Sequence, residues 1–128
     1  DEMETCRPWL DRQIKVIDPK IFVPLGRYAL RKFIPNAVIS NEHGNVYERS
    51  GRIYFVMYHP AVALYKGSMR EVLLDDFKTL KAFLDGEIEP RSLDDAVSNI
   101  IAEKEKDKAK DTNKREAKDS ADQVGMEF

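Results

Sequence analysis

The stretch IYFVMYHPAVALYKG, from Ile53 to Gly67, constrains the fold of this chain more than any other segment. Its first six residues form the most apolar run of the sequence, which is typical of a central strand in a sheet. The run ends at His59-Pro60, and proline cannot donate to a strand ladder. The segment therefore predicts a buried strand whose carboxyl end carries a histidine, a side chain that titrates near neutral pH.

The segments before this strand indicate an α/β unit. Residues 21–25 form a short apolar run typical of a parallel strand, although Pro24 weakens it. A glycine turn leads from this run into a helix over residues 26–34, and strand, turn and helix are half of a βαβ unit. Residues 46–58 are typical of a hairpin with its turn at Ser50-Gly51.

Two further segments have helical spacing. In residues 4–17, apolar side chains recur on one face, and we expect the helix to start near Thr5 or Cys6 with Pro8 in its first turn. Residues 68–84 predict the clearest helix, with a capping box from Ser68 to Glu71. Its expected apolar stripe consists of Leu73, Phe77, Leu80 and Leu84.

The character of the chain changes after Pro90. From Glu103 to Asp122, fourteen of twenty residues are charged, seven of each sign, so this stretch cannot bury enough apolar surface to order itself by packing. We therefore divide the 128 residues into a packed unit over 1–88 and a charged tail over 89–128, either helical or disordered.

Overall composition limits the classes of function. The net charge of −2 gives no general attraction to nucleic acid, so such a partner must be met by a local patch. A single cysteine cannot form an internal disulfide, which fits a reducing compartment. No apolar run approaches the ~20 residues that span a membrane. We expect a cytoplasmic monomer with no membrane partner.

Several quoted motifs occur in one order: CRPWLDRQIKVIDPKIFVPLGRYAL, then HG, then YHPAVALYKG and LLDDFKTLKAFL. Together they resemble the second half of a family 4 uracil-DNA glycosylase, the iron–sulfur type of archaea and many bacteria. The resemblance covers residues 4–84. It implies a three-layer α/β/α glycosylase-like fold with a mainly parallel central sheet, here followed by the charged tail. It also implies excision of uracil from DNA in base excision repair.

The resemblance implies one cofactor ligand in this chain. Cys6, in CRPWL, matches the last of four cysteines that hold a 4Fe-4S cluster in the family. The other three cysteines, the first active-site loop and the uracil-stacking aromatic lie upstream in family members and are absent here. The chain therefore resembles a carboxyl-terminal half that is inactive by itself. The alternative, judged from the residue type alone, is that Cys6 is a small residue of the hydrophobic core.

The resemblance also assigns roles to the His-Pro segment. His59 matches the histidine that donates a hydrogen bond to the departing uracil and stabilises its developing charge. Leu64, with Tyr65 beside it, would wedge the duplex after the base has flipped, and Lys66 or Arg70 would contact phosphate. The alternatives remain a strand-end His59 bonded to a backbone carbonyl and a Leu64 packed beneath the loop.

His43 and the carboxyl-terminal peptide have simpler interpretations. His43 belongs to a turn that the family shares, and we expect a structural role, with a positive φ at Gly44. The terminal QVGMEF faintly resembles a sliding-clamp peptide, with Gln123, Met126 and Phe128 as anchors; alternatively it is a solvated end. The whole chain is alternatively a non-catalytic glycosylase-like binding module, or a region related to phage-type DNA polymerases.

Overall fold

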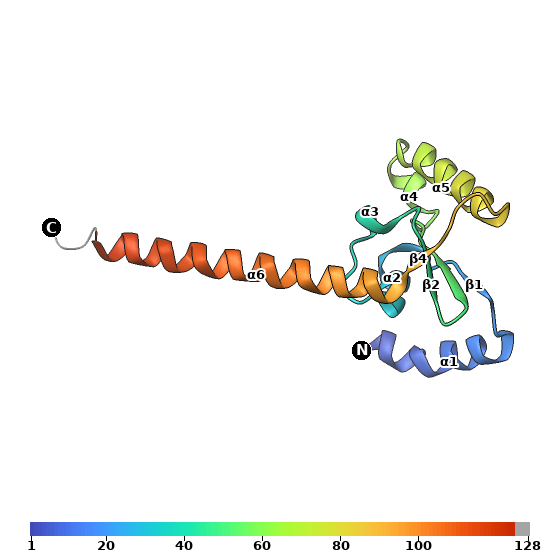
Figure 1. Ribbon diagram of the computed structural model, residues 1–128, viewed down its shortest axis with the longest axis horizontal. Helices are drawn as coiled ribbons and strands as arrows, with labels where there is room; N and C mark the ends of the chain where they lie inside the picture. The colour runs from blue at the N-terminus through green and yellow to red at the C-terminus, as the bar shows by residue number, and fades with distance from the viewer. Residues whose placement is uncertain (125–128) are drawn as a thin grey trace.

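The computed structural model describes residues 1–124, with side chains described through residue 114. A layered α/β unit carries one long helix that projects away from it (Figure 1). The elements, in chain order, are α1 (Glu2–Ile17), β1 (Ile21–Phe22), α2 (Gly26–Phe33), α3 (Ile39–Glu42), β2 (Val46–Arg49), β3 (Arg52–Phe55), α4 (Val62–Tyr65), α5 (Met69–Leu84), β4 (Arg91–Ser92) and α6 (Leu93–Val124).

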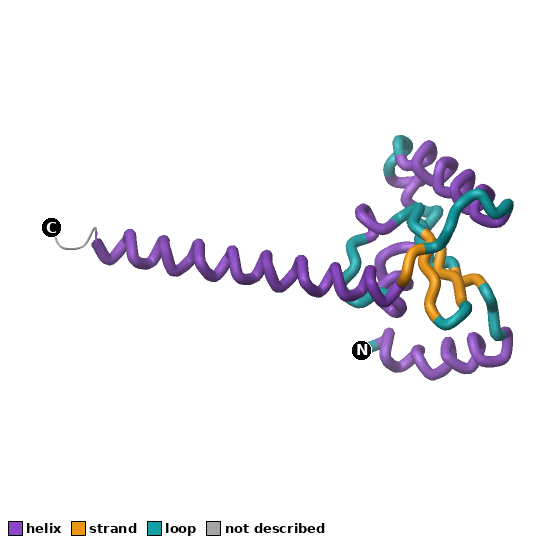
Figure 2. The backbone as a smooth tube through the Cα atoms, in the orientation of Figure 1, coloured by secondary structure: helices purple, strands orange, loops and turns teal. Residues whose placement is uncertain are grey.

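The four described strands form one mixed sheet in the order β1-β3-β2-β4. The strands, orange in Figure 2, lie close together within the α/β unit. Strand β3 pairs in parallel with β1, where Ile21 is opposite Ile53, and antiparallel with β2, where Tyr47 is opposite Tyr54. Strand β4 joins β2 in parallel. The predicted hairpin and the predicted inner position of the apolar strand are both confirmed.

Each face of the sheet has its own hydrophobic core. One core lies under α2 and the start of α6, and the other lies under α5, so the layers are helix, sheet and helix (Figure 1). The predicted three-layer α/β/α arrangement is confirmed. Each fully buried Leu or Phe stabilises the fold by about 1.5–3 kcal/mol through apolar burial. The buried residues that dominate the two cores are Leu30, Ile34, Val56 and Leu93 on one face and Phe55, Met57 and Leu73 on the other.

Packing continues beyond residue 88. Strand β4 pairs with β2, and Leu93, the first residue of α6, is almost fully buried in the first core. Val97 and Ile100 of the next turns pack against the same core. We therefore propose that the boundary between packed unit and tail lies after Ile100 and not at residue 88.

Helix α1 differs from the prediction at its start. It begins at Glu2, because the carboxylate of Asp1 accepts a hydrogen bond of 2.9 Å from the backbone N–H of Met3 and caps the helix. Pro8 consequently lies inside the helix and not in its first turn, where it removes one backbone hydrogen bond. The helix ends as predicted at Asp18, which adopts a left-handed conformation before Pro19.

Helix α5 spans the predicted residues, and Leu73 and Leu80 of the predicted apolar stripe face the core. Ser68 makes no side-chain hydrogen bond to the helix start, so the predicted capping box is wrong. Phe77 and Leu84, predicted in the apolar stripe, are exposed. The residues that face the core are Leu73, Asp76, Leu80 and Phe83.

Helix α6 continues without a break from Leu93 to Val124, so the helical alternative for the tail holds over the described residues. Its side chains are exposed from Ile101 through residue 114, and the helix runs away from the α/β unit (Figure 1). Met126 and Phe128 of the clamp-like peptide lie outside the described residues. Among the described helices, none is both long enough and apolar enough to span a membrane.

Candidate functional site

The candidate site lies where the parallel strands β1 and β3 end. Beyond the regular pairing, Leu25 and Met57 form an isolated parallel bridge. The N–H of Met57 donates to the carbonyl of Pro24 (3.3 Å), and the N–H of Gly26 donates to the carbonyl of Met57 (2.9 Å). In open α/β sheets, ligands bind outside the carboxyl ends of the strands. The backbone thus fixes His59 at the edge where a ligand is expected.

Gly26 allows helix α2 to begin directly against His59. Its φ of +83° favours glycine, and a Cβ placed there would be 3.2 Å from the Cβ of His59. The first turn of α2 follows at once and carries Arg27. Backbone N–H groups at a helix start and a guanidinium both favour a nearby anion. The guanidinium of Arg27 lies over the ring of Tyr28, its neighbour on α2, and Gly26 brings the start of this helix against His59.

His59 is exposed, and its hydrogen bonding defines its tautomer. The backbone N–H of Ala61 donates to Nδ1 of His59 at 3.1 Å. Because a backbone amide can only donate here, Nδ1 is an acceptor, and the neutral ring carries its proton on Nε2. Among the described residues, Nε2 has no hydrogen-bond partner. The alternative that a backbone carbonyl satisfies this ring is wrong, and the ring presents a free N–H to the outside.

The segment after His59 folds back as the short helix α4. The N–H of Val62 donates to the carbonyl of His59 at 3.0 Å, so the helix starts within one turn of the histidine. Val62 and Ala63 pack against the second core. Leu64 and Tyr65 face outward with 84% and 90% of their surface exposed. The alternative that Leu64 packs beneath the loop is therefore wrong.

Two cations follow Leu64 and Tyr65 in the chain. Lys66 ends α4 and Arg70 lies in the first turn of α5, and both side chains are exposed. Neither makes an ion pair within the part of the chain that the structure describes. One continuous segment therefore presents a hydrogen-bond donor, two apolar side chains and two unpaired cations.

Cys6 lies on α1 and belongs to a separate surface. Its side chain is exposed, so the alternative of a small core residue is wrong. It lines a cavity of about 460 Å³ between α1 and α2, together with Leu10 and Tyr28. Within residues 1–114, no three His, Cys, Asp or Glu side chains are placed to hold a metal ion. A cluster of the 4Fe-4S type normally needs four thiolates, so the residues of this chain alone do not fit one.

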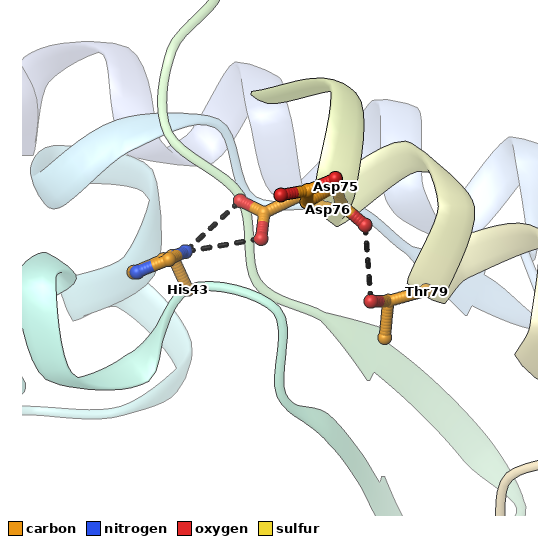
Figure 3. Close-up of polar contacts among 4 residues, drawn as sticks. All are labelled: His43, Asp75, Asp76 and Thr79. Atoms are coloured by element: carbon orange, nitrogen blue, oxygen red, sulfur yellow. Dashed lines mark hydrogen bonds and ion pairs between the residues drawn. The ribbon is translucent and has the colours of Figure 1, made fainter. Parts of the chain in front are cut away.

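Asp76 is a buried polar residue that was not among the predicted site residues. This carboxylate is only 4% exposed, and both of its oxygens contact Nδ1 of His43, at 3.0 and 3.1 Å (Figure 3). The predicted structural role of His43 remains a prediction, and the predicted positive φ of Gly44 is confirmed at +76°. The available signal for Asp76 was its place three residues after Leu73, on the core-facing side of the helix.

Comparison with known proteins gives a consistent result. Residues 1–84 match the family model of the uracil DNA glycosylase superfamily. The chain is similar to the type-4 uracil-DNA glycosylases of Sulfurisphaera tokodaii, with 38% identity over 63% of this chain, and Archaeoglobus fulgidus, with 40% identity over 62%. A DNA polymerase of Bacillus phage SP01 is 30% identical over 67% of this chain, but over only 9% of its own length.

The matches cover only part of the related enzymes. The chain spans 41% of the length of the S. tokodaii glycosylase and 45% of the A. fulgidus one. More than half of each relative therefore has no counterpart in these residues.

Proposed function

Because the chain belongs to the uracil DNA glycosylase superfamily, we propose that it supplies the uracil-binding histidine and the DNA-contacting loop of a uracil-DNA glycosylase. Such an enzyme flips uracil out of DNA and hydrolyses its N-glycosidic bond, which begins base excision repair. The observation that carries the proposal is the Nε2–H of His59, which is unpartnered among the described residues, on a ring whose Nδ1 already accepts a backbone hydrogen bond.

The proposed chemistry of His59 follows from where charge develops. Breaking the N-glycosidic bond leaves the electron pair on the departing uracil, so negative charge builds on its ring and carbonyl oxygens. An Nε2–H directed at a uracil carbonyl stabilises that charge, and a neutral imidazole is sufficient for this role. Loss of one preorganised donor typically raises such a barrier by about 2.7–4 kcal/mol. His59 is therefore proposed as the residue of this chain that contributes most to the chemical step.

The exposed segment after His59 fits the other requirement of the reaction, which is access to the base. Uracil must leave the base stack, and apolar wedges inserted into the duplex compensate for that loss. We assign this role to Leu64, with Tyr65 beside it. Lys66 and Arg70 would neutralise phosphates on either side, which sets affinity and register without reading sequence.

The rest of the site is proposed to come from residues outside this chain. The chain spans less than half the length of the relatives named glycosylases, so more than half of each relative has no counterpart here. Helix α1 exposes a broad apolar surface, including Trp9, which is 66% exposed. Additional residues of a longer protein would have this surface to pack on.

Cys6 is proposed as one ligand of an iron–sulfur cluster whose remaining ligands lie outside the 128 residues. Its exposed position on α1, beside the cavity shared with α2, is compatible with that role. No step of the chemistry above passes through a cluster. Replacing Cys6 with alanine in the complete protein should abolish iron binding, measured by iron content and visible absorbance. Full iron occupancy in that variant would reject the assignment.

Abasic-site formation tests the enzyme proposal against a binding module. The complete open reading frame that encodes this chain is expressed and incubated with DNA containing a single uracil, alongside a thymine control. The proposal expects alkali-labile abasic sites only in the uracil substrate. DNA binding without any abasic sites would favour the non-catalytic module instead.

The similarity to a phage DNA polymerase supports a second candidate, a glycosylase-like region attached to a polymerase. Reading the DNA upstream of the codon for Asp1 separates the two. A continuous frame that encodes three more cysteines and a further glycosylase motif supports the repair enzyme. A frame that encodes polymerase motifs supports the second candidate.

The carboxyl-terminal peptide is proposed as a contact for a sliding clamp, through Gln123, Met126 and Phe128. The support is the spacing of these residues and the long exposed stretch of α6 that precedes them. A peptide of residues 118–128 should bind the clamp of the same organism with micromolar affinity, and Phe128→Ala should abolish binding. Calorimetry without heat at high peptide concentration would exclude this partner.

A further inference from the structure

The hydrogen-bonded pair of Asp76 and His43 lies outside the surface assigned to DNA, yet it adjoins the residue that precedes His59. Asp76 points from α5 toward the turn after α3, where both of its oxygens lie within 3.1 Å of Nδ1 of His43 (Figure 3). The neighbouring carboxylate, Asp75, is exposed and pairs with Lys78 on the same helix. Two adjacent aspartates thus have different environments, and only one is buried.

The burial of Asp76 is costly if stability is its only purpose. Taking a carboxylate out of water costs several kcal/mol, and a single partner repays this only with good geometry. An apolar residue at this position of α5 would pack against the same core without that cost. What a buried carboxylate with both oxygens on one ring nitrogen adds is a fixed position for the ring that it contacts. The arrangement therefore indicates that the position of His43 matters.

The turn that carries His43 is shaped around the same carboxylate. Gly44 has a φ of +76°, and a Cβ there would lie 2.9 Å from Oδ1 of Asp76. The N–H of Gly44 donates to the carbonyl of Val56 at 2.8 Å, and the N–H of Val56 donates to Asn45 at 3.0 Å. The turn is thus locked between Asp76 and the backbone that continues from β3 toward His59.

The ring of His43 in turn contacts Tyr58. The two ring centroids are 4.7 Å apart with the planes tilted by 38°, so the rings are in direct contact. Tyr58 immediately precedes His59 and packs with the second core. On the opposite side, Gly26 and Pro24 bond the backbone of Met57. The approach to His59 is therefore held by backbone hydrogen bonds on one side and by side chains on the other.

We propose that Asp76 is a positioning residue for His59, acting through His43 and Tyr58. It holds the ring of His43 against Tyr58, and this contact fixes the backbone conformation in which Ala61 donates to Nδ1 of His59 and Nε2–H remains free. The inference rests on the proposed function of His59, but it concerns the conformation of the loop and can be measured without uracil or DNA.

Nitrogen NMR of the histidine rings and amide hydrogen exchange test the proposal in the 128-residue chain. The wild type should show His59 as a single tautomer with its proton on Nε2. In Asp76→Asn, which keeps the size of the side chain, the His59 ring signals should move toward averaged tautomers. Exchange at the Ala61 amide should accelerate by about tenfold, the equivalent of one lost hydrogen bond. Asp75→Asn is the matched control and should change neither signal.

A second pair of variants, at Tyr58, tests the same proposal if Asp76→Asn does not fold. Tyr58→Phe keeps the ring against His43 and should preserve the His59 tautomer and the protection of Ala61. Tyr58→Ala removes the ring, leaves Asp76 bonded to His43, and should lose both. Unchanged His59 signals in Asp76→Asn or in Tyr58→Ala, even with a lower melting temperature, would overturn the proposal. If these variants show that Asp76 positions His59 but the complete protein excises no uracil, the proposed function alone is rejected.

Discussion

Helices α1 and α5 have the same length, sixteen residues, and both have apolar side chains at helical spacing. They differ in whether any of their side chains are buried. Helix α5 buries Leu73 and Asp76 and closes one face of the sheet. None of the sixteen described residues of α1 is buried, and only Ile14 packs against the first core. The apolar face of α1 is largely exposed even though its pattern is equally regular.

Amphipathic spacing thus predicts a helix, but it does not predict whether another surface covers the apolar face of that helix. The face under α5 is complete within this chain, and it supports the loop that carries His59. The face under α1 has only scattered contacts, such as the ion pair between Lys32 and Asp11 at 2.5 Å. We therefore expect stability and loop geometry to depend on α5, and α1 to contribute little within the 128 residues.

The largest expected contrast comes from one leucine on each helix. Leu73→Ala should lower the free energy of unfolding by about 2–5 kcal/mol, because it leaves a cavity in a packed core. Leu10→Ala on α1 removes the same atoms from a side chain that is already exposed, and should cost no more than about 1 kcal/mol. Urea unfolding of both variants measures this. Equal losses would mean that α1 is as well packed as α5 in solution.

A smaller contrast separates two glycine turns. Gly44 and Gly51 both have positive φ, but a Cβ on Gly51 would meet nothing within 4 Å. Gly51→Ala should therefore cost only the conformational strain of about 1–2 kcal/mol. Gly44→Ala adds a clash with Asp76 and should cost at least ~1 kcal/mol more. Thermal unfolding of the two variants gives the difference. Equal costs would show that the turn is not packed on Asp76.

The smallest expected effect concerns pH on the face under α2 and α6. Burial, followed by its hydrogen bond to Glu42, raises the pKa of Tyr47 well above its usual range. The folded state thus holds this proton more tightly than the unfolded state. The resulting stability is present below a pH of about 10 and is lost as the pH rises further. Tyr47→Phe should flatten that alkaline decline in urea titrations, and an unchanged slope would contradict the assignment.

Much of this architecture was predictable from local patterns. A few residues were enough to predict the apolar strand before His59, the hairpin, and the glycine turn into α2. The predicted stripe of α5 was half right: Leu73 and Leu80 face the core, whereas Phe77 and Leu84 have helical spacing but are exposed. The spacing from Leu73 indicates that Asp76 and not Asp75 faces the core, but its partner His43 is distant in the sequence and is found only in the structure. The tautomer of His59 likewise depends on a hydrogen bond that no sequence pattern encodes.

Single-turnover excision of uracil by the complete protein tests the proposal that His59 of this chain is the donor that stabilises departing uracil. In the complete protein, His59→Ala should slow excision of uracil by two to three orders of magnitude, equivalent to about 2.7–4 kcal/mol, because one preorganised donor is lost. DNA affinity should stay nearly unchanged, since phosphate contacts dominate it. Near-normal single-turnover rates in the variant, with DNA binding intact, would contradict the claim.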